Sequence, residues 1–166
     1  MQFKLFAFAA LAATAVADLQ RALEIVDMTA IQLNATLGGN GAEETTLASV
    51  SKDAVRLVID METATEFANI SAVLDRDAAL AVADTTGTLA SDLGDVVDGF
   101  IRNRPSFDRL IFITPIIGDL IIKQRAAAKE LSVAILAKIP KDLANATAIH
   151  TKEIDDKFAQ GIKAYA

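Results

Sequence analysis

LIFITPIIGDLII, at residues 110–122, is an almost uninterrupted run of large apolar side chains. Nine of its thirteen residues are Leu, Ile or Phe, and only Thr114, Pro115, Gly118 and Asp119 interrupt them. A helix that is apolar on all sides is normally buried on all sides. We therefore expect this segment either to be the central element of the fold or to face apolar material that is not protein.

The composition indicates a single helical domain without disulfide bonds. The chain has 166 residues, enough for one domain, and no cysteine for disulfides or thiolate metal sites. Hydrophobic residues make up 52% of the chain and aromatic residues only 5%, which favours helices packed closely through alanine. The net charge of −6 argues against binding to nucleic acid or to anionic lipid headgroups.

Residues 1–17, MQFKLFAFAALAATAVA, have the three parts of a secretory signal peptide. Lys4 supplies the positive region, residues 5–13 are apolar, and Ala-Val-Ala at 15–17 is a small-residue cleavage site. The segment is too short to span a bilayer. We expect it to be removed, which leaves one secreted domain, residues 18–166, without a transmembrane segment. The ending GIKAYA also lacks the hydrophobic tail of a GPI-anchor signal.

Three Asn-x-Ser/Thr sequons acquire meaning if the chain is exported. They begin at Asn34, Asn69 and Asn145. The pattern is loose, but three sequons in a short exported chain favour a glycoprotein with at least one occupied site. Asn34 lies beside a predicted buried stripe, which argues against its use.

Apolar residues recur at gaps of three and four along five segments, which is the pattern of amphipathic helices. We expect these helices at residues 18–37, 44–69, 75–102, 107–139 and 141–165. The glycine-rich stretch at 38–41 and the prolines at 105 and 140 mark boundaries between them. The predicted fold is all-α, an antiparallel bundle of about five amphipathic helices.

Two features leave local alternatives open. LIFI and LII in the opening stretch are compatible with strands, but the helical run that follows and the absence of partner strands favour a helix. Pro115 then either lies in the first turn of a helix or kinks a longer one. In the third segment Gly87, Gly94 and Gly99 mark close helix contacts, bends or a break.

No catalytic or metal-binding constellation is recognisable. The nucleophile elbow, the zinc-protease motif and the phosphate-binding loop are all absent, so we expect no enzyme and no cofactor. His150, the single histidine, lies on an apolar helix face and is predicted to be a core residue with one hydrogen bond. Asp92, Asp95 and Asp98 are three residues apart; we interpret them as a solvated face and not a metal site.

The fourth segment carries more apolar surface than one stripe requires, and two arrangements explain the surplus. The segment is central and covered by the other four helices, or the bundle encloses an apolar cavity or groove. The residues of that candidate ligand wall are Phe107, Ile111, Phe112, Ile116, Ile117, Leu120 and Ile121. Filled cores are the commoner outcome, because protein interiors are packed to crystal-like density.

Three landmarks give the chain a family resemblance. They are SDLGDVVDGF at 91–100, RNRPSF at 102–107 and the ending DDKFAQGIKAYA at 155–166. With the Ala-rich leader and the cysteine-free helical layout, the chain resembles the fungal hydrophobic surface-binding protein A (HsbA) family, which includes the cell wall galactomannoproteins.

The resemblance implies a secreted or cell-wall protein without catalytic activity. It implies binding to apolar surfaces or to lipids such as fatty acids, and recruitment of secreted cutinase-like hydrolases that degrade polyesters. Wall-bound relatives often carry a Ser/Thr-rich tail, which this chain lacks, so a released protein is favoured. The alternative is a structural or antigenic cell wall mannoprotein without a ligand.

Overall fold

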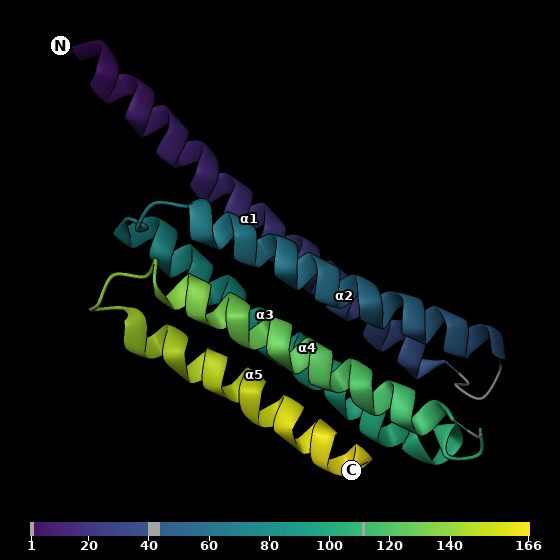
Figure 1. Cartoon of the computed structure of the whole chain (residues 1–166). Coiled ribbons are helices and arrows are strands. Elements are labelled where there is room, and N and C mark those ends of the chain that lie inside the picture. The colour runs from purple at the N-terminus through teal and green to yellow at the C-terminus, as the bar shows by residue number, and fades with distance from the viewer. Residues whose placement is uncertain (1, 40–43, 111) are drawn as a thin grey trace.

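A computed structural model describes the backbone of residues 2–39, 44–110 and 112–166, and side chains from residue 16 onward except 40–46 and 111. Its helices are α1 (Gln2–Gly38), α2 (Glu44–Ile70), α3 (Arg76–Phe107), α4 (Ile113–Leu136) and α5 (Ala144–Tyr165) (Figure 1). The described ranges contain no strand, and the predicted all-α bundle is confirmed. Most of the predicted signal peptide, residues 1–17, lies outside the described side chains and stays a prediction.

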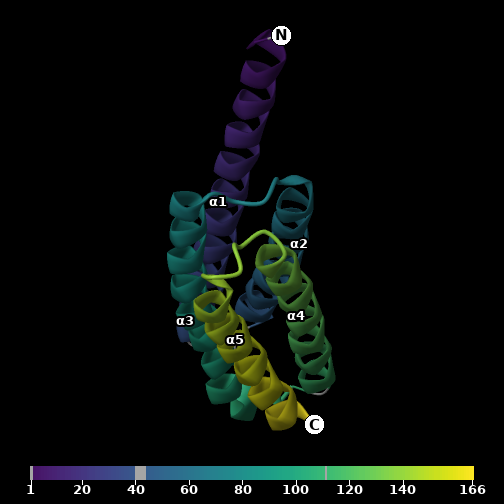
Figure 2. The ribbon, with the colours of Figure 1, turned by 90° about the vertical axis from the view of Figure 1, so that its left-hand side faces the viewer.

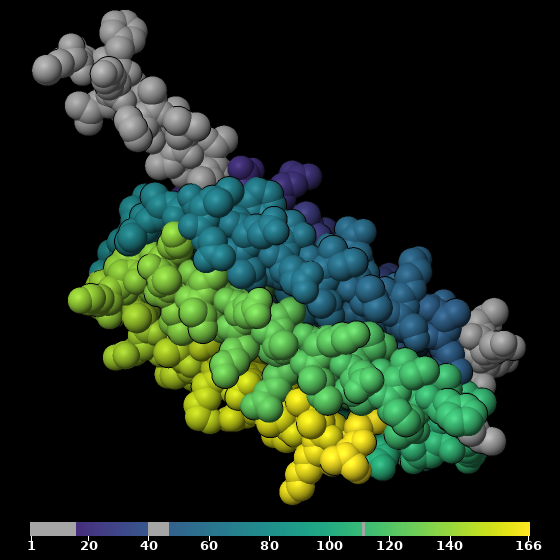
Figure 3. Space-filling view, in the orientation of Figure 1, coloured from purple at the N-terminus to yellow at the C-terminus, as the bar shows by residue number. Residues whose placement is uncertain are grey.

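The helices form two layers: a layer of three helices packs on a layer of two. Successive helices run in opposite directions, so α1, α3 and α5 are parallel and lie side by side, while α2 and α4 form the second layer (Figure 2). The α1–α2 and α4–α5 contacts join the layers at their two edges, and α3 touches α4 more lightly across the middle. Each helix therefore belongs to a closed ring, and α4 is not a central helix covered by the other four. Figure 3 shows α2 and α4 side by side on one outer face.

The predicted stripes form the core. The apolar stripes of α1, α2 and α3 are buried; the buried stripe members are Val50, Ala54, Leu57, Met61, Ala64 and Ala68 in α2, and Ala79, Val82, Thr86, Leu89, Leu93, Val96 and Phe100 in α3. The α1 members, all no more than 2% exposed, are Leu19, Leu23, Val26, Ala30, Leu33 and Leu37. Asp75 caps α3, because its Oδ1 accepts a hydrogen bond of 2.9 Å from the backbone N–H of Ala78. Local periodicity thus determines which face of each helix turns inward.

Helix α3 continues past Pro105, so the boundary predicted there is wrong. Proline has no N–H, so the carbonyl of Ile101 lacks its helical hydrogen bond. This loss is tolerated because Pro105 lies in the last turn of the helix. Two residues later the ring of Phe107 is fully buried, and the N–H of Asp108 bonds to the carbonyl of Arg104 at 2.9 Å. Burying a phenyl ring is worth about 1.5–3 kcal/mol, the same order as the cost of an internal proline.

The opening stretch divides into a turn and a helix. Phe112 adopts a left-handed backbone with φ of 78°, which costs about 1–2 kcal/mol for a residue other than glycine. The turn is held by the Thr114 hydroxyl, which donates to Asp108 at 2.7 Å. Pro115 lies in the first turn of α4, where its missing N–H has no helical partner to lose. Of the two alternatives for this proline, the start of a helix is the one found.

Candidate functional site

Four residues of the predicted ligand wall lie in the core. They are Phe107, Ile117, Leu120 and Ile121. The other two described residues, Phe112 and Ile116, are 79% and 49% exposed. Ile111 lies outside the described residues. The surplus apolar surface of the stretch is therefore divided between the inside of the bundle and its outer face, and the predicted wall residues do not form one surface.

A regular ring of five helices leaves more space at its centre than a ring of four. At helix spacings of 8–10 Å, the centre of a regular five-membered ring lies roughly 7–8.5 Å from each axis, against roughly 6–7 Å for four helices. A helix with its side chains has a radius of only about 5–6 Å, so large side chains must fill the difference. Phe100 and Phe158 are among the largest fully buried side chains, and the α3–α4 contact flattens the ring. The space inside the ring is therefore filled by large side chains and reduced by the approach of α3 to α4.

The backbone of α5 lies close to side chains of α3 and α4 at Gly161. A Cβ atom at Gly161 would lie 2.9 Å from Cγ1 of Val97 and 3.2 Å from Cγ2 of Ile121. Nearby, the hydroxyl of Tyr165 donates to the carbonyl of Phe100 at 2.7 Å, and burial raises the pKa of this hydroxyl. The landmark ending of the sequence thus has a structural explanation, since it locks the last helix onto two others.

One polar side chain in the core stands out from its surroundings. Gln124 of α4 is 0% exposed, and its Nε2 donates to the carbonyl of Ala54 on α2 at 3.2 Å. Its Oε1 is buried and has no hydrogen-bond partner. Sequence reasoning missed this residue, although Gln124 continues the inward stripe of Ile117 and Ile121 at helical spacing. A polar residue on a buried stripe was the signal that would have found it.

Charged pairs connect the helices at the surface. Arg125 of α4 forms two hydrogen bonds to Asp155 of α5, at 2.8 and 2.9 Å, and they hold the pKa of that carboxyl below its usual value. Lys157 of α5 bonds to Asp98 of α3 at 2.9 Å, which supports the interpretation of Asp98 as part of a solvated face. Among the described residues no three carboxylate or imidazole groups gather as a metal site.

Among the carboxyl groups that the structure describes, that of Asp27 on α1 has its pKa raised to about 6, first by burial and second by its hydrogen bond with Asp92 of α3. The folded chain therefore keeps a proton there that the unfolded chain releases near pH 4. The folded state binds more protons in this window, so the free energy of unfolding contributed by Asp27 falls as the pH rises from about 4 to about 6. This linkage is opposite in sign to that of a salt-bridged carboxylate.

His150 lies at a helix seam and not in the core. Its side chain is 36% exposed, and its Nδ1 is 3.1 Å from Oε2 of Glu153 on the same helix. A Cβ atom at Gly87 of α3 would lie 3.2 Å from Nε2 of the ring. The predicted single hydrogen bond is present, but the predicted core position is wrong, because the imidazole needs the space that Gly87 leaves at the surface.

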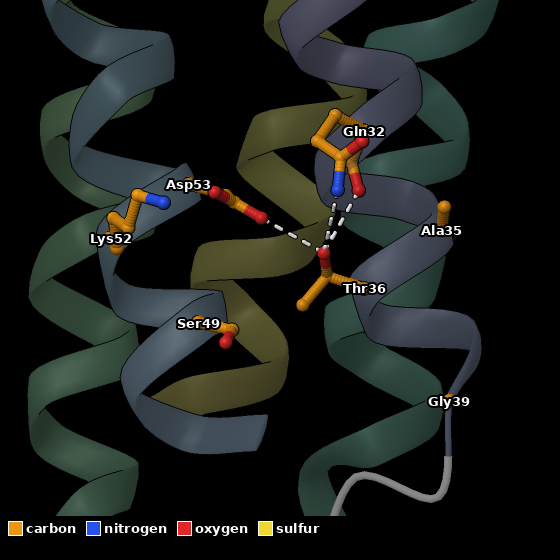
Figure 4. A pocket seen from close by; sticks show the side chains of 7 residues that line it. All are labelled: Gln32, Ala35, Thr36, Gly39, Ser49, Lys52 and Asp53. Carbon is orange, nitrogen blue, oxygen red and sulfur yellow. Dashed lines mark hydrogen bonds between the residues drawn. The ribbon is translucent and has the colours of Figure 1, made fainter. Parts of the chain in front are cut away.

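Grooves follow the outer seams between helices. One of about 580 Å³ lies between α2 and α4 and includes Val133 and Asn69, and one of about 420 Å³ between α1 and α2 includes Ile25, Ile59 and Phe67. A third, of about 420 Å³, lies where α1 ends and α2 begins (Figure 4). Its lining is mainly polar, which does not suit an acyl chain.

The three sequons differ in exposure. Asn34 is partly buried within α1, and the hydroxyl of Thr36 in the same sequon donates to Asp53 of α2 at 2.8 Å (Figure 4). Asn69 near the end of α2 and Asn145 in the first turn of α5 are exposed.

A sequence profile described as hydrophobic surface binding protein A matches residues 13–137, about three quarters of the chain. The chain belongs to the hydrophobic surface binding protein A family. No curated protein matches this HsbA-family chain. None of its described helices combines the length and the apolar character needed to cross a bilayer.

Solved structures share the HsbA fold found here. The crystal structure of AFMP4P in complex with palmitic acid matches with a TM-score of 0.87 and 16% identity, over 91% of this chain and 99% of that one. Ligand binding domain 1 of the Penicillium marneffei MP1 protein, complexed with arachidonic acids, matches with a TM-score of 0.85 and 18% identity, over 92% and 99%. Ligand binding domain 2 of MP1, complexed with multiple arachidonic acids, gives 0.83 and 17%, over 91% and 96%. At these identities the likeness shows a common fold.

Proposed function

We propose that this protein binds a fatty acid non-covalently inside its helical bundle and has no catalytic activity. The observation that carries the proposal is the shared fold, over nine tenths of the chain, with two proteins solved in complex with palmitic or arachidonic acid. The interior of the bundle supports it, because apolar side chains from all five helices meet there. Each methylene of an acyl chain moved from water into such an interior contributes about 0.8 kcal/mol.

The light contact between α3 and α4 supports a mechanism in which the bundle opens to admit the chain. α4 touches α3 only lightly, so α4 can separate from α3 at less cost than helices joined along a full seam. The predicted wall residues Phe107, Ile117, Leu120 and Ile121 would then contact the acyl chain from the core side. Phe112 and Ile116, which are exposed beside the turn, would line the entrance.

Native mass spectrometry and thermal unfolding test this function. The secreted protein, stripped of lipid and mixed with palmitic acid, should retain one or more acyl chains in the mass spectrum. Ligand at one hundred times its dissociation constant should stabilise the fold by about 2.7 kcal/mol, which is measured as a higher melting temperature. A spectrum without adducts, together with an unchanged melting temperature, would exclude fatty-acid binding.

A second candidate function is adsorption to apolar solid surfaces, with recruitment of cutinase-like hydrolases to polyesters. It is favoured by exposed apolar side chains on neighbouring helices, Met28 and Ile31 of α1 and Val55 and Ile59 of α2. Depletion of the protein from solution by hydrophobic beads should weaken in the Ile31→Ser, Ile59→Ser double variant. Equal depletion of both proteins would exclude this face. A chain that neither adsorbs nor carries lipid would leave the structural cell wall mannoprotein as the better description.

We further propose that the protein is secreted, loses residues 1–17 and carries glycans. The exposed side chains of Asn69 and Asn145 make them the favoured acceptors, and Asn34 is the weakest candidate because it is partly buried. Mass spectrometry of protein recovered from culture medium should find Asp18 at the N-terminus and a mass decrease after enzymatic deglycosylation. Recovery of the protein only from the wall fraction would favour residence in the cell wall over release.

A further inference from the structure

Gln124 combines complete burial with an unused hydrogen-bond acceptor. Its side chain is 0% exposed, its Nε2 bonds to Ala54, and its Oε1 has no partner. A swapped amide would not relieve this, because it would bring Oε1 against the carbonyl oxygen of Ala54, which is another acceptor. Buried acceptors are nearly always satisfied, so an unsatisfied one at the centre of a core requires an explanation.

Gln124 lies about halfway along α4, on the buried side of the helix. One turn earlier, Ile121 packs against Gly161 of α5, where Val97 of α3 also makes contact. The next residue, Arg125, bonds to Asp155 on the α5 side. Gln124 itself bonds to α2, so its amide lies between the two helices of the second layer, and its neighbours Ile121 and Arg125 face α5.

We propose that Gln124 is the polar anchor that holds the carboxyl group of the bound fatty acid, in its neutral, protonated form. The O–H of the acid donates to Oε1 of Gln124, and the acid's carbonyl oxygen accepts the second N–H of Nε2. This inference rests on the proposed fatty-acid-binding function and adds the residue that recognises the headgroup. A ligand whose headgroup has no hydroxyl donor, such as an ester, leaves Oε1 of Gln124 without a hydrogen-bond partner.

The neutral form of the acid follows from the surroundings. The buried polar residues among the described side chains are Asp60, Ser71, Thr86, Gln124 and Thr147, so no lysine or arginine is available inside to pair with a carboxylate. Burial in an apolar interior raises the pKa of a carboxyl group and favours its protonated state. An amide and a protonated carboxyl group are complementary, because each offers one donor and one acceptor.

Thr147 supplies a matched control. Its side chain is also 0% exposed and its Oγ1 also lacks a partner, but it lies in the first turn of α5. Thr147→Val removes this hydroxyl with almost no change in shape, as Gln124→Met removes the amide. Because it also removes the sequon at Asn145, all proteins are compared in unglycosylated form. The two variants therefore separate the anchor from a general effect of removing buried polar atoms.

The experiment compares palmitic acid with its methyl ester, which has no hydroxyl donor. Dissociation constants for both probes are measured by titration calorimetry with delipidated wild-type protein and both variants. The ratio of ester to acid dissociation constants should fall about ten-fold in Gln124→Met, because a hydrogen bond between partners buried in the core is lost. It should be unchanged in Thr147→Val, and ester binding should persist in all three proteins, which also reports that they are folded.

An unchanged ratio in Gln124→Met would overturn the anchor while leaving fatty-acid binding intact. Should Gln124→Met fail to fold, Gln124→Leu provides the same comparison. A ratio that falls equally in the Thr147→Val variant would also overturn the specific role of Gln124. Absence of binding for both probes in the wild-type protein would overturn the proposed function itself, and the anchor with it.

Discussion

Replacing Gly161 with alanine tests how tightly the last helix is locked onto the bundle. The new Cβ atom would lie 2.9 Å from Cγ1 of Val97 and 3.2 Å from Cγ2 of Ile121. Both neighbours are 0% exposed and therefore have little room to move. Adding a methyl group to a well-packed core costs about 1–3 kcal/mol, while alanine gains about 1 kcal/mol over glycine in a helix. Gly161→Ala should therefore lower the free energy of unfolding by about 1 kcal/mol.

Gly94→Ala in α3 is the matched control. There the nearest atom to the new Cβ is the Lys157 Cε at 3.6 Å, which is an ordinary contact with the end of a flexible side chain. The gain in helix propensity should then act alone and stabilise the fold by up to about 1 kcal/mol. The propensity gain cancels between the two variants, so their difference of about 1–3 kcal/mol measures the crowding at Gly161.

Urea unfolding followed by circular dichroism measures this difference. The midpoint should shift without a change in the denaturant slope, which would show that the compactness of the end states is unchanged. For a domain of this size each kcal/mol corresponds to about 2–4 °C in melting temperature. If the Gly161→Ala protein were as stable as the Gly94→Ala protein, α5 would not approach α3 and α4 as closely as described, and the reasoning would be refuted.

Four further variants test three separate parts of the fold. Asp27→Asn should raise the free energy of unfolding at pH 7 by about 1 kcal/mol, after discounting for partial exposure, and should abolish the decline between pH 4 and 6 in urea titrations. Tyr165→Phe removes the hydrogen bond to Phe100 and should cost about 0.5–1.5 kcal/mol by the same assay. Ile117→Ala should cost about 2–5 kcal/mol, whereas Ile116→Ala at a half-exposed position should change stability by less than about 0.5 kcal/mol in thermal scans.

The two isoleucines of that comparison show the limit of reading α4 from its sequence. Ile116 and Ile117 are equally apolar and adjacent, yet one is 49% exposed and the other is fully buried. Because the segment has hydrophobic residues on every side, its sequence does not show which side faces the core. The sequence therefore suggested a helix covered on all sides. The stripe becomes visible only once α2 and α5 are known to cover one side of α4.

Local patterns were sufficient for the helices themselves. The stripes of α1, α2 and α3 and the end of α1 at Gly38 all depend on residues within a few positions of one another. Such features follow from the 3.6-residue period and from capping chemistry, which act within a single helix. The five-helix architecture was therefore predictable before any contact between helices was known.

The sequence by itself determined that this protein is a bundle of five amphipathic helices, because helix periodicity is a local property. Only the tertiary structure decided that α1, α3 and α5 pack side by side, that Gly161 admits two neighbours and that Gln124 stands in the core with an unused acceptor. These facts depend on pairings such as that of Gln124 with Ala54, 70 positions earlier in the chain. No local pattern encodes which distant helix will supply the partner.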